Sequence, residues 1–134
     1  MLDTMQMGVL DRCGLARRPR LSPDICIQLA HDVNTTVRIE LATNPGTPQD
    51  ILVQLAQDGS CSVRYAVARN PRSSPAVLAA LLAHNKLHAG IKGIIAQHPN
   101  LPDDMLCQLA NDADSYVRDC VYERRRRIAN PGYI

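Results

Sequence analysis

The chain has 134 residues, of which 46% are hydrophobic, with four Tyr, no Phe or Trp, and a formal net charge of +2. This length fits one domain, residues 1–134, whose core has to be built from aliphatic side chains and cysteine. The charge is too small to indicate a nucleic-acid partner by itself, and with no long apolar run in the sequence no membrane span is expected.

The cysteine pattern bears on compartment and cofactor. Cys13, Cys26, Cys61, Cys107 and Cys120 are odd in number and far apart. A secreted disulfide framework favours an even count, and metal motifs need close pairs such as C-x-x-C. The residues before Cys13 have neither the basic start nor the apolar core of a signal peptide. We therefore expect reduced thiols in a cytoplasmic protein that holds no cofactor.

The first 20 residues are expected to form an N-terminal cap and half a repeat. Asp11 to Pro19 aligns with Val63 to Pro71, so the domain begins with the second helix of a repeat unit. Met1 to Leu10 is a candidate capping helix in front of it.

Four repeats are predicted over residues 21–125, followed by an irregular tail over 126–134. Pro19, Pro45, Pro71 and Pro99, which close units, recur every 26 to 28 residues. The units are Ser22 to Pro45, Thr47 to Pro71, Ser74 to Pro99 and Leu101 to Arg125. Self-similarity at such a period indicates a solenoid, in which each unit packs only on its neighbours.

Each unit is expected to hold two helices. Ser22, Thr47 and Ser74 precede a proline and are predicted N-caps, whereas Leu101 at the same place should weaken its helix start. Apolar residues then follow one helical face for about three turns; in the second unit these are Ile51, Leu52, Leu55 and Ala56. A second, shorter helix of either α or 3₁₀ type ends before Asn-Pro, because a residue preceding proline avoids the α region.

An acid stands six residues before an arginine in three units. The pairs are Asp32 and Arg38, Asp58 and Arg64, and Asp112 and Arg118, and in the third unit Asn85 and Lys92 take these places. We expect a ladder in which each Asp lies near its own Arg and that of the next layer, since the guanidinium can bridge carboxylates and loop carbonyls. The alternative is a basic stripe that grips an acidic partner.

The chain resembles the leucine-rich repeat variant family. The resemblance rests on the Asn-Pro corner, the Thr-Pro or Ser-Pro start, L-x-x-L-A-x-D and V-R-x-x-V-A; Thr47 to Pro71 carries the whole pattern, and coverage is about residues 11–125. It implies a right-handed, all-α solenoid in which α-helices alternate with shorter, partly 3₁₀ helices. The acid–arginine spacing is also similar to HEAT repeats, but a unit this short does not hold two long helices. The iron–sulfur module that can precede such repeats is absent, because only Cys13 lies within the first 20 residues.

Three histidines and the single cysteines are the candidate metal-binding or nucleophilic residues of the sequence. His84 and His88 are four residues apart, with His98 nearby, a spacing that can share a metal on a helix. No carboxylate or cysteine completes a ligand set, so polar edge positions are the favoured interpretation. No phosphate loop, nucleophile elbow or Cys–His pair is evident. The chain is expected not to be an enzyme and to have no small-molecule substrate.

The arginine run from Arg124 to Arg127 has two interpretations. Basic runs bind phosphates or acidic partners, and Arg17, Arg18, Arg20 and Arg72 near the corners would extend a basic edge. A terminal repeat also needs a polar outer face, so the run equally fits a solvated end-cap.

The function predicted from this architecture is a non-catalytic binding module or scaffold for a protein partner. The expected surface is the exposed side of one helix column together with the arginine run; its residues are Gln28, Gln54, Gln57, Tyr65, Arg69, Arg124, Arg125, Arg126 and Arg127. The alternative is nucleic acid bound through its phosphate backbone by the arginine-rich edge. Both rest on fold-level analogy.

Overall fold

The computed structural model describes residues 3–84, 87–130 and 132, and within them the chain is all helical. No helix in these ranges is both long and apolar enough to cross a bilayer. The elements are η1 (Thr4–Gln6), α1 (Val9–Ala16), α2 (Pro23–Ala30), α3 (Thr35–Thr43), α4 (Gln49–Leu55), α5 (Cys61–Arg69), α6 (Pro75–Leu82), α7 (Ala89–Ala96), α8 (Asp103–Ala110) and α9 (Ser115–Ala129).

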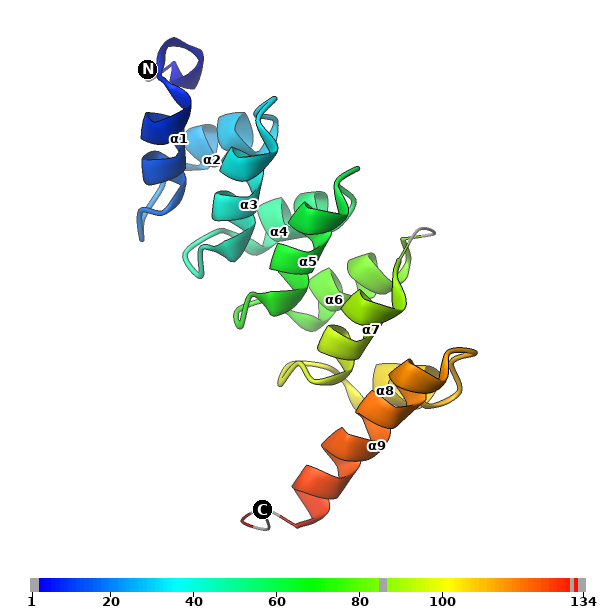
Figure 1. Cartoon of the computed structure of the whole chain (residues 1–134). Coiled ribbons are helices and arrows are strands. Elements are labelled where there is room, and N and C mark those ends of the chain that lie inside the picture. The colour runs from blue at the N-terminus through cyan, green and yellow to red at the C-terminus, as the bar shows by residue number, and fades with distance from the viewer. Residues whose placement is uncertain (1–2, 85–86, 131, 133–134) are drawn as a thin grey trace.

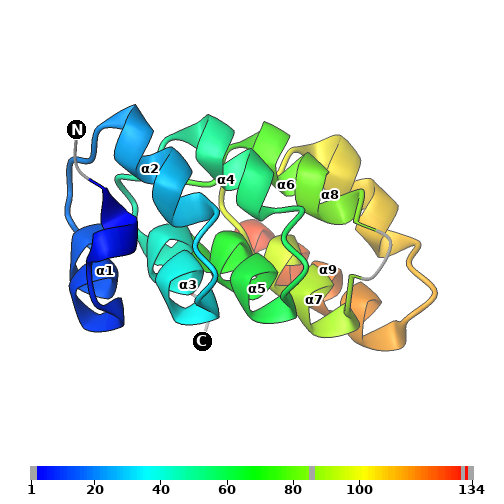
Figure 2. The same cartoon turned by 90° about the horizontal axis from the view of Figure 1, so that it is seen from above.

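The helices form two parallel rows that run the length of the molecule (Figures 1 and 2). One row, the even row, holds α2, α4, α6 and α8; the other, the odd row, holds α1, α3, α5, α7 and α9. Each odd-row helix packs on the next one of its row, and in the even row α2 packs on α4 and α4 on α6; the stacking is closest in the odd row. The architecture is therefore an α-solenoid of four helix pairs preceded by a half-unit, α1, as the sequence predicts.

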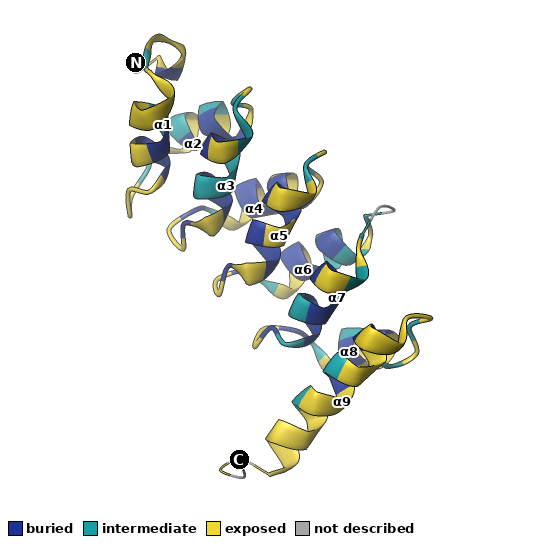
Figure 3. Cartoon of the chain, viewed as in Figure 1, coloured by how far each residue is buried: buried dark blue, intermediate teal, exposed yellow. Residues whose placement is uncertain are grey.

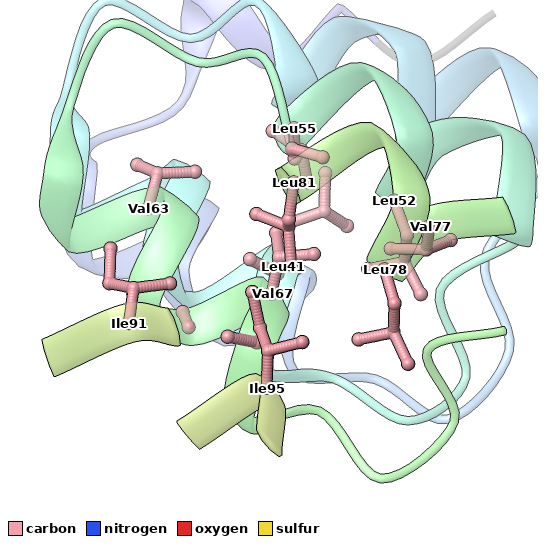
Figure 4. Close-up of a cluster of buried hydrophobic side chains, with 14 of the residues drawn as sticks. Leu41, Leu52, Leu55, Val63, Val67, Val77, Leu78, Leu81, Ile91 and Ile95 are labelled. Atoms are coloured by element: carbon pink, nitrogen blue, oxygen red, sulfur yellow. The ribbon is translucent and has the colours of Figure 1, made fainter. Parts of the chain in front are cut away.

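The core lies between the two rows and continues through every layer (Figure 3). Each unit contributes the same small set of Leu, Ile and Val side chains from both of its helices. Those of the central layers pack in register in Figure 4; they are Leu41, Leu52, Leu55, Val63, Val67, Val77, Leu78, Leu81, Ile91 and Ile95. Burial of apolar area at roughly 25 cal/mol per Å² is the main stabilising term of such a stack.

The relative helix lengths differ from the prediction. The even-row helices are 7 or 8 residues long, near two turns, while α3 and α5 of the odd row have 9 residues each. All the second helices are α rather than 3₁₀. The first helix ends early because its last polar residues form a turn; Asp58, for example, donates its backbone N–H to Leu55 and accepts one at its carboxylate from Ser60.

Two of the three predicted N-caps are confirmed and one is wrong. Ser22 and Ser74 cap α2 and α6 through their hydroxyls. Thr47 is instead buried one residue ahead of the cap position and donates its hydroxyl to the Leu41 carbonyl at 2.6 Å. No side chain caps α8, as expected for the unit that begins with Leu101, and Leu101 itself is buried in the loop before this helix.

Both ends of the chain depart from expectation as well. In place of a capping helix, the described residues before α1 form the single 3₁₀ turn η1, and α1 begins at Val9. At the other end α9 has 15 residues and runs through the start of the predicted tail to Ala129. Its last turns are exposed (Figure 3), because none of the described helices packs on them.

Candidate functional site

Ion pairs join the layers along the loops that link each even-row helix to the following odd-row helix. Arg12 binds Asp32 at 2.6 Å, Arg38 binds Asp58 at 2.9 Å, and Lys92 binds Asp112 at 2.9 Å. We call these three pairs the charge ladder. The side chains of its two arginine pairs are 6% to 17% exposed, so the ladder is largely shielded from water. The structural role predicted for these columns is thus consistent with the geometry.

The direction of the contacts differs from the prediction. Each carboxylate binds the basic residue of the layer before it and does not bind the arginine six residues later. That arginine holds the Asp backbone instead: Nη1 of Arg38 donates to the Asp32 carbonyl at 2.6 Å, and Nη1 of Arg118 donates to the Asp112 carbonyl at 2.7 Å. Arg12 and Arg38 therefore each bind a backbone carbonyl of their own layer and reach forward to the acid of the next layer.

Asp112 shows the electrostatic effect of this arrangement. The backbone N–H of Asp114, which donates to the Asp112 carboxylate at 2.9 Å, is the main cause that lowers the pKa of Asp112. The hydrogen bond and charge of Lys92 lower it further. The ionised carboxylate is therefore the form that belongs to the folded layer.

The ladder has a gap in the middle of the molecule. Arg64 donates Nη1 to the Asp58 carbonyl at 2.6 Å and is only 3% exposed, yet its Nε has no hydrogen-bond partner among the described residues. The predicted counterpart, Asn85, lies outside the described residues. His84 occupies the aspartate place: its backbone N–H bonds to Leu81 as that of Asp58 bonds to Leu55. The predicted alignment was wrong by one residue, because the longer third unit hid its register.

A second column of side chains joins the layers at the Asn-Pro corners. Asn44 donates to the carbonyls of Ala16 and Arg18, and Asn70 donates to those of Ala42 and Asn44. We call this the corner column; it comprises Asn44, Asn70, His98 and Arg124. The sequence marked these asparagines only as turn residues, although their repetition every 26 residues was the available signal.

His98 and Arg124 continue the corner column. His98 contacts the Asn70 carbonyl through Nε2 at 2.8 Å, and Arg124 donates to the carbonyls of Ala96 and His98. His98 is thus buried in the stack, and no group of three or more potential metal-ligating residues is found in the described part of the chain. The histidine cluster considered from the sequence does not form around His98.

The arginine run does not form one basic surface. Arg124 is used in the corner column, Arg125 approaches the Cys107 sulfur at 3.7 Å, and Arg126 pairs with Glu123 at 3.1 Å. Arg127 donates to the side-chain oxygen of Gln97, the residue that follows α7. Successive residues of a helix point in different directions, so the four side chains of this run spread around α9.

The predicted binding surface is divided between the two rows. Gln28 and Gln54 lie on α2 and α4, where Gln28 accepts hydrogen bonds from Thr4 and Gln54 contacts His31. Gln57 follows α4 and donates to the Ala80 carbonyl of the next unit at 2.5 Å. These glutamines bridge elements of the stack, whereas Tyr65 and Arg69 lie on α5 in the odd row.

A groove of about 810 Å³ runs over α3, α5 and α7 on the odd row. Its floor is apolar and includes Ile39, Ala66, Ile91 and Ile94, and its rim includes Tyr65, Arg69, His88 and Tyr116. We call it the α5 groove. Two of the residues predicted for a binding surface, Tyr65 and Arg69, thus line it; the histidine and the second tyrosine were not predicted.

Tyr65 and Arg69 form a pair one turn apart on α5. The guanidinium carbon of Arg69 lies 5.6 Å from the centre of the Tyr65 ring, and its Nη1 donates to the Tyr65 hydroxyl at 3.1 Å. Tyr65 is nevertheless 42% exposed. The pair presents an aromatic face and a cation that keeps free donors toward solvent.

A second cavity of about 690 Å³ continues from the α5 groove toward α9 and shares Arg69, Ile94 and Tyr116 with it. Gly93 lies under the Tyr116 ring: a Cβ on Gly93 would stand 2.7 Å from Cε1 of that ring. The hydrogen bond of Tyr116 with Cys120 is the main cause that raises the pKa of Tyr116, and Tyr65 adds a smaller contribution. The sequence left two interpretations of Gly93 open, a bend or a close contact. The structure shows a close contact with the Tyr116 ring.

The thiols lie apart from these features for the most part. Cys13 and Cys26 are buried in the core, and burial, with a contribution from Asp50, raises the pKa of Cys26. Cys61 on the rim of the α5 groove and Cys107 on α8 are exposed. All five cysteines are free thiols in this structure.

Layers of short paired helices joined by repeated side-chain bonds define the class of this molecule, a helical repeat protein. The family model described as leucine rich repeat variant matches residues 35–60, one period that begins with α3 and ends just before α5. This match confirms the resemblance predicted from the sequence for that unit. Neither the comparison with curated proteins nor that with solved structures gives a match.

Proposed function

We propose that this chain is a non-catalytic binding module whose partner is a protein, and that the partner lies along the α5 groove. The observation that carries the proposal is the presence of Tyr65, Tyr116 and Arg69 on one hollowed surface. Tyr65 and Tyr116 are 42% and 53% exposed, although each has a large apolar ring. Tyrosine and arginine are the residue types that most often dominate binding energy at protein interfaces.

Repeat architecture supports the same choice. The charge ladder, the corner column and the bridging glutamines are occupied by bonds within the stack. The α5 groove instead combines an apolar floor with polar groups at its rim, the composition expected of a binding site. Solenoids commonly bind along one such extended face.

The test is a pull-down from cells that contain the protein, comparing wild type with the double variant Tyr65→Ala/Tyr116→Ala. We expect partners that survive 200 mM salt and nuclease treatment to be lost with the double variant. Tyr122→Ala is the matched control, because Tyr122 is exposed on α9 and lies outside both cavities.

The result also separates the protein partner from the alternative, nucleic acid. Bound material that disappears with nuclease and with salt would replace the protein partner by nucleic acid. Partners retained equally by wild type and by Tyr65→Ala/Tyr116→Ala would show that binding occurs on another face.

A further inference from the structure

We propose that the α5 groove takes an acidic peptide segment, in which a carboxylate binds Arg69 and a neighbouring apolar side chain enters the groove. This inference rests on the proposed function, since it names the chemistry of the partner at the same surface. Three features support it: the charge of the groove, the unused hydrogen-bond donors of Arg69 and the apolar floor.

The charge of the groove is one-sided. Among the described residues that line it, Arg69 is the one with a formal charge at neutral pH, and neither Asp nor Glu is present. None of the ion pairs in the described part of the chain includes Arg69. The buried and half-buried arginines of the odd row are held by contacts within the stack, whereas Arg69 is exposed and lies at the groove.

Arg69 is also held in place for such a contact. Its hydrogen bond to the Tyr65 hydroxyl uses one of five N–H donors, and the ring of Tyr65 lies beneath the guanidinium. A planar guanidinium fixed in this way loses less side-chain freedom when it binds a carboxylate through two parallel hydrogen bonds. A positioned, unneutralised arginine favours a carboxylate over a neutral or basic partner group.

The floor accounts for the apolar part of the ligand. Ile39, Ala66, Ile91 and Ile94 come from three successive helices of the odd row and form a continuous apolar surface below Arg69. Gly90 on α7 leaves this end of the groove open, because no side chain stands there. A Leu, Ile or Phe next to the acid would cover this surface and exclude water from it.

The charged residues of the neighbouring cavity bear on the direction in which an acidic peptide can extend from Arg69. Asp119 and Glu123 of α9 line that cavity, and Glu123 is paired with Arg126. Arg127 also lines that cavity but donates to Gln97, so the carboxylate of Asp119 disfavours an acidic segment extended in that direction. We therefore place the acid over α5, with the apolar residue toward α3 and α7.

The experiment uses a panel of fluorescein-labelled dodecapeptides in a Gly/Ser background. Each peptide carries one Leu or Phe and, one to four residues away, Glu, Ser or Lys, and binding to the full chain is measured by fluorescence polarisation. We expect peptides with Glu to bind about tenfold more tightly than the matched Ser peptides and to lose this preference at high salt. Lys peptides should bind least.

Charge reversal gives the sharper comparison. In Arg69→Glu the preference should invert, so that Lys peptides bind more tightly than Glu peptides. Arg20→Glu makes the same change of charge at an exposed loop residue outside the groove and should leave the order of the panel unchanged.

The outcomes separate this inference from the proposed function. If no Glu peptide binds, or if Glu and Ser peptides bind alike, the acidic ligand is overturned, while partner capture that depends on Tyr65 and Tyr116 would still support a protein-binding groove. If Glu peptides bind equally well to wild type and to Arg69→Glu, the carboxylate does not contact Arg69 and the inference also fails.

Discussion

Arg38 reaches from one layer of the solenoid to Asp58 of the next, binding its carboxylate through Nε at 2.9 Å. The following step of the same column is Arg64, and there the place of the acid is taken by His84. Arg64 is nonetheless as well buried as any charged residue in the described chain. The charge ladder thus has three ion pairs and one gap, at Arg64, which a substitution at residue 84 can fill.

His84→Asp should stabilise the protein. A carboxylate at this place would accept from the unpartnered Nε of Arg64, and hydrogen bonds to charged groups contribute about 1.5–3 kcal/mol. Part of this gain is offset by the contacts that His84 loses, so we expect a rise of about 1 kcal/mol in the free energy of unfolding in urea. His84→Asn is the control, because it matches the shape without the charge; equal stability of the two variants would mean that Arg64 does not receive the carboxylate.

The corner column should be more important to stability than the exposed asparagine beside it. Asn70→Ala leaves the buried carbonyls of Ala42 and Asn44 without their donor, which costs about 1–3 kcal/mol per unsatisfied group. Asn100 also donates to two carbonyls but is exposed, so water can replace it in Asn100→Ala. Chemical denaturation of the two variants should show the larger loss for Asn70→Ala, and a reversed order would contradict the structural role of the column.

The pKa of Asp112 gives the stability a dependence on acid pH. Because this pKa is lower in the folded chain than its ordinary value of 3.8, the ionised carboxylate stabilises the fold fully above 3.8, and the contribution is lost as the pH falls from 3.8 through the lower pKa of the folded chain. Stability measured between about pH 5 and 2 should therefore fall more steeply for wild type than for Asp112→Asn. Asp119→Asn removes an exposed carboxylate of the same layer and controls for net charge. A wild-type slope equal to that of Asp112→Asn would show that the bonds from Asp114 and Lys92 do not favour the ionised form.

Two glycines in helices should respond differently to the same substitution. Gly14 lies inside α1 with nothing within 4 Å of an added Cβ, so Gly14→Ala should stabilise by about 0.5–1 kcal/mol. Gly93→Ala gains the same helix propensity but has to move the Tyr116 ring, so we expect a smaller gain or a loss. Thermal unfolding measures both. Fluorescence of the tyrosines should change for Gly93→Ala alone, and an identical gain for both variants would mean that the Tyr116 contact is not maintained in solution.

The layers could be predicted well from the sequence because the repeat period is marked by residues, such as proline, that adopt only a few backbone conformations. Proline after asparagine and Ser before proline restrict the chain locally, and their recurrence therefore located the corners without any knowledge of contacts. The apolar residues of each unit, such as Leu52 and Leu55, likewise predicted the buried faces. Helix lengths could be predicted less well. Asp58 ends its helix in a turn because its carboxylate binds the Ser60 backbone and the Arg38 side chain, and the contact with Arg38 is not visible in the local sequence.

The candidate surface was predicted only in part, for a related reason. Gln54 and Tyr65 both show an exposed polar or amphipathic pattern, but the row to which each belongs depends on how the two helices of a unit pack. The sequence predicted that Arg124 belongs to a basic run with the three arginines that follow it. In the structure it binds the carbonyls of Ala96 and His98 in the previous layer. Tyr116 was not predicted as a surface residue of the groove, because its contact with Gly93 joins two units and has no counterpart in the other units.

The corner column also imposes an order on how the molecule is made. Asn44, Asn70, His98 and Arg124 each contact carbonyls that precede them by 26 to 28 residues, and never carbonyls that follow. A ribosome synthesises the chain from its N-terminus, so the carbonyl groups that each unit contacts leave the exit tunnel before their donors. The solenoid is therefore suited to grow one layer at a time during translation, with each finished end serving as the template for the next.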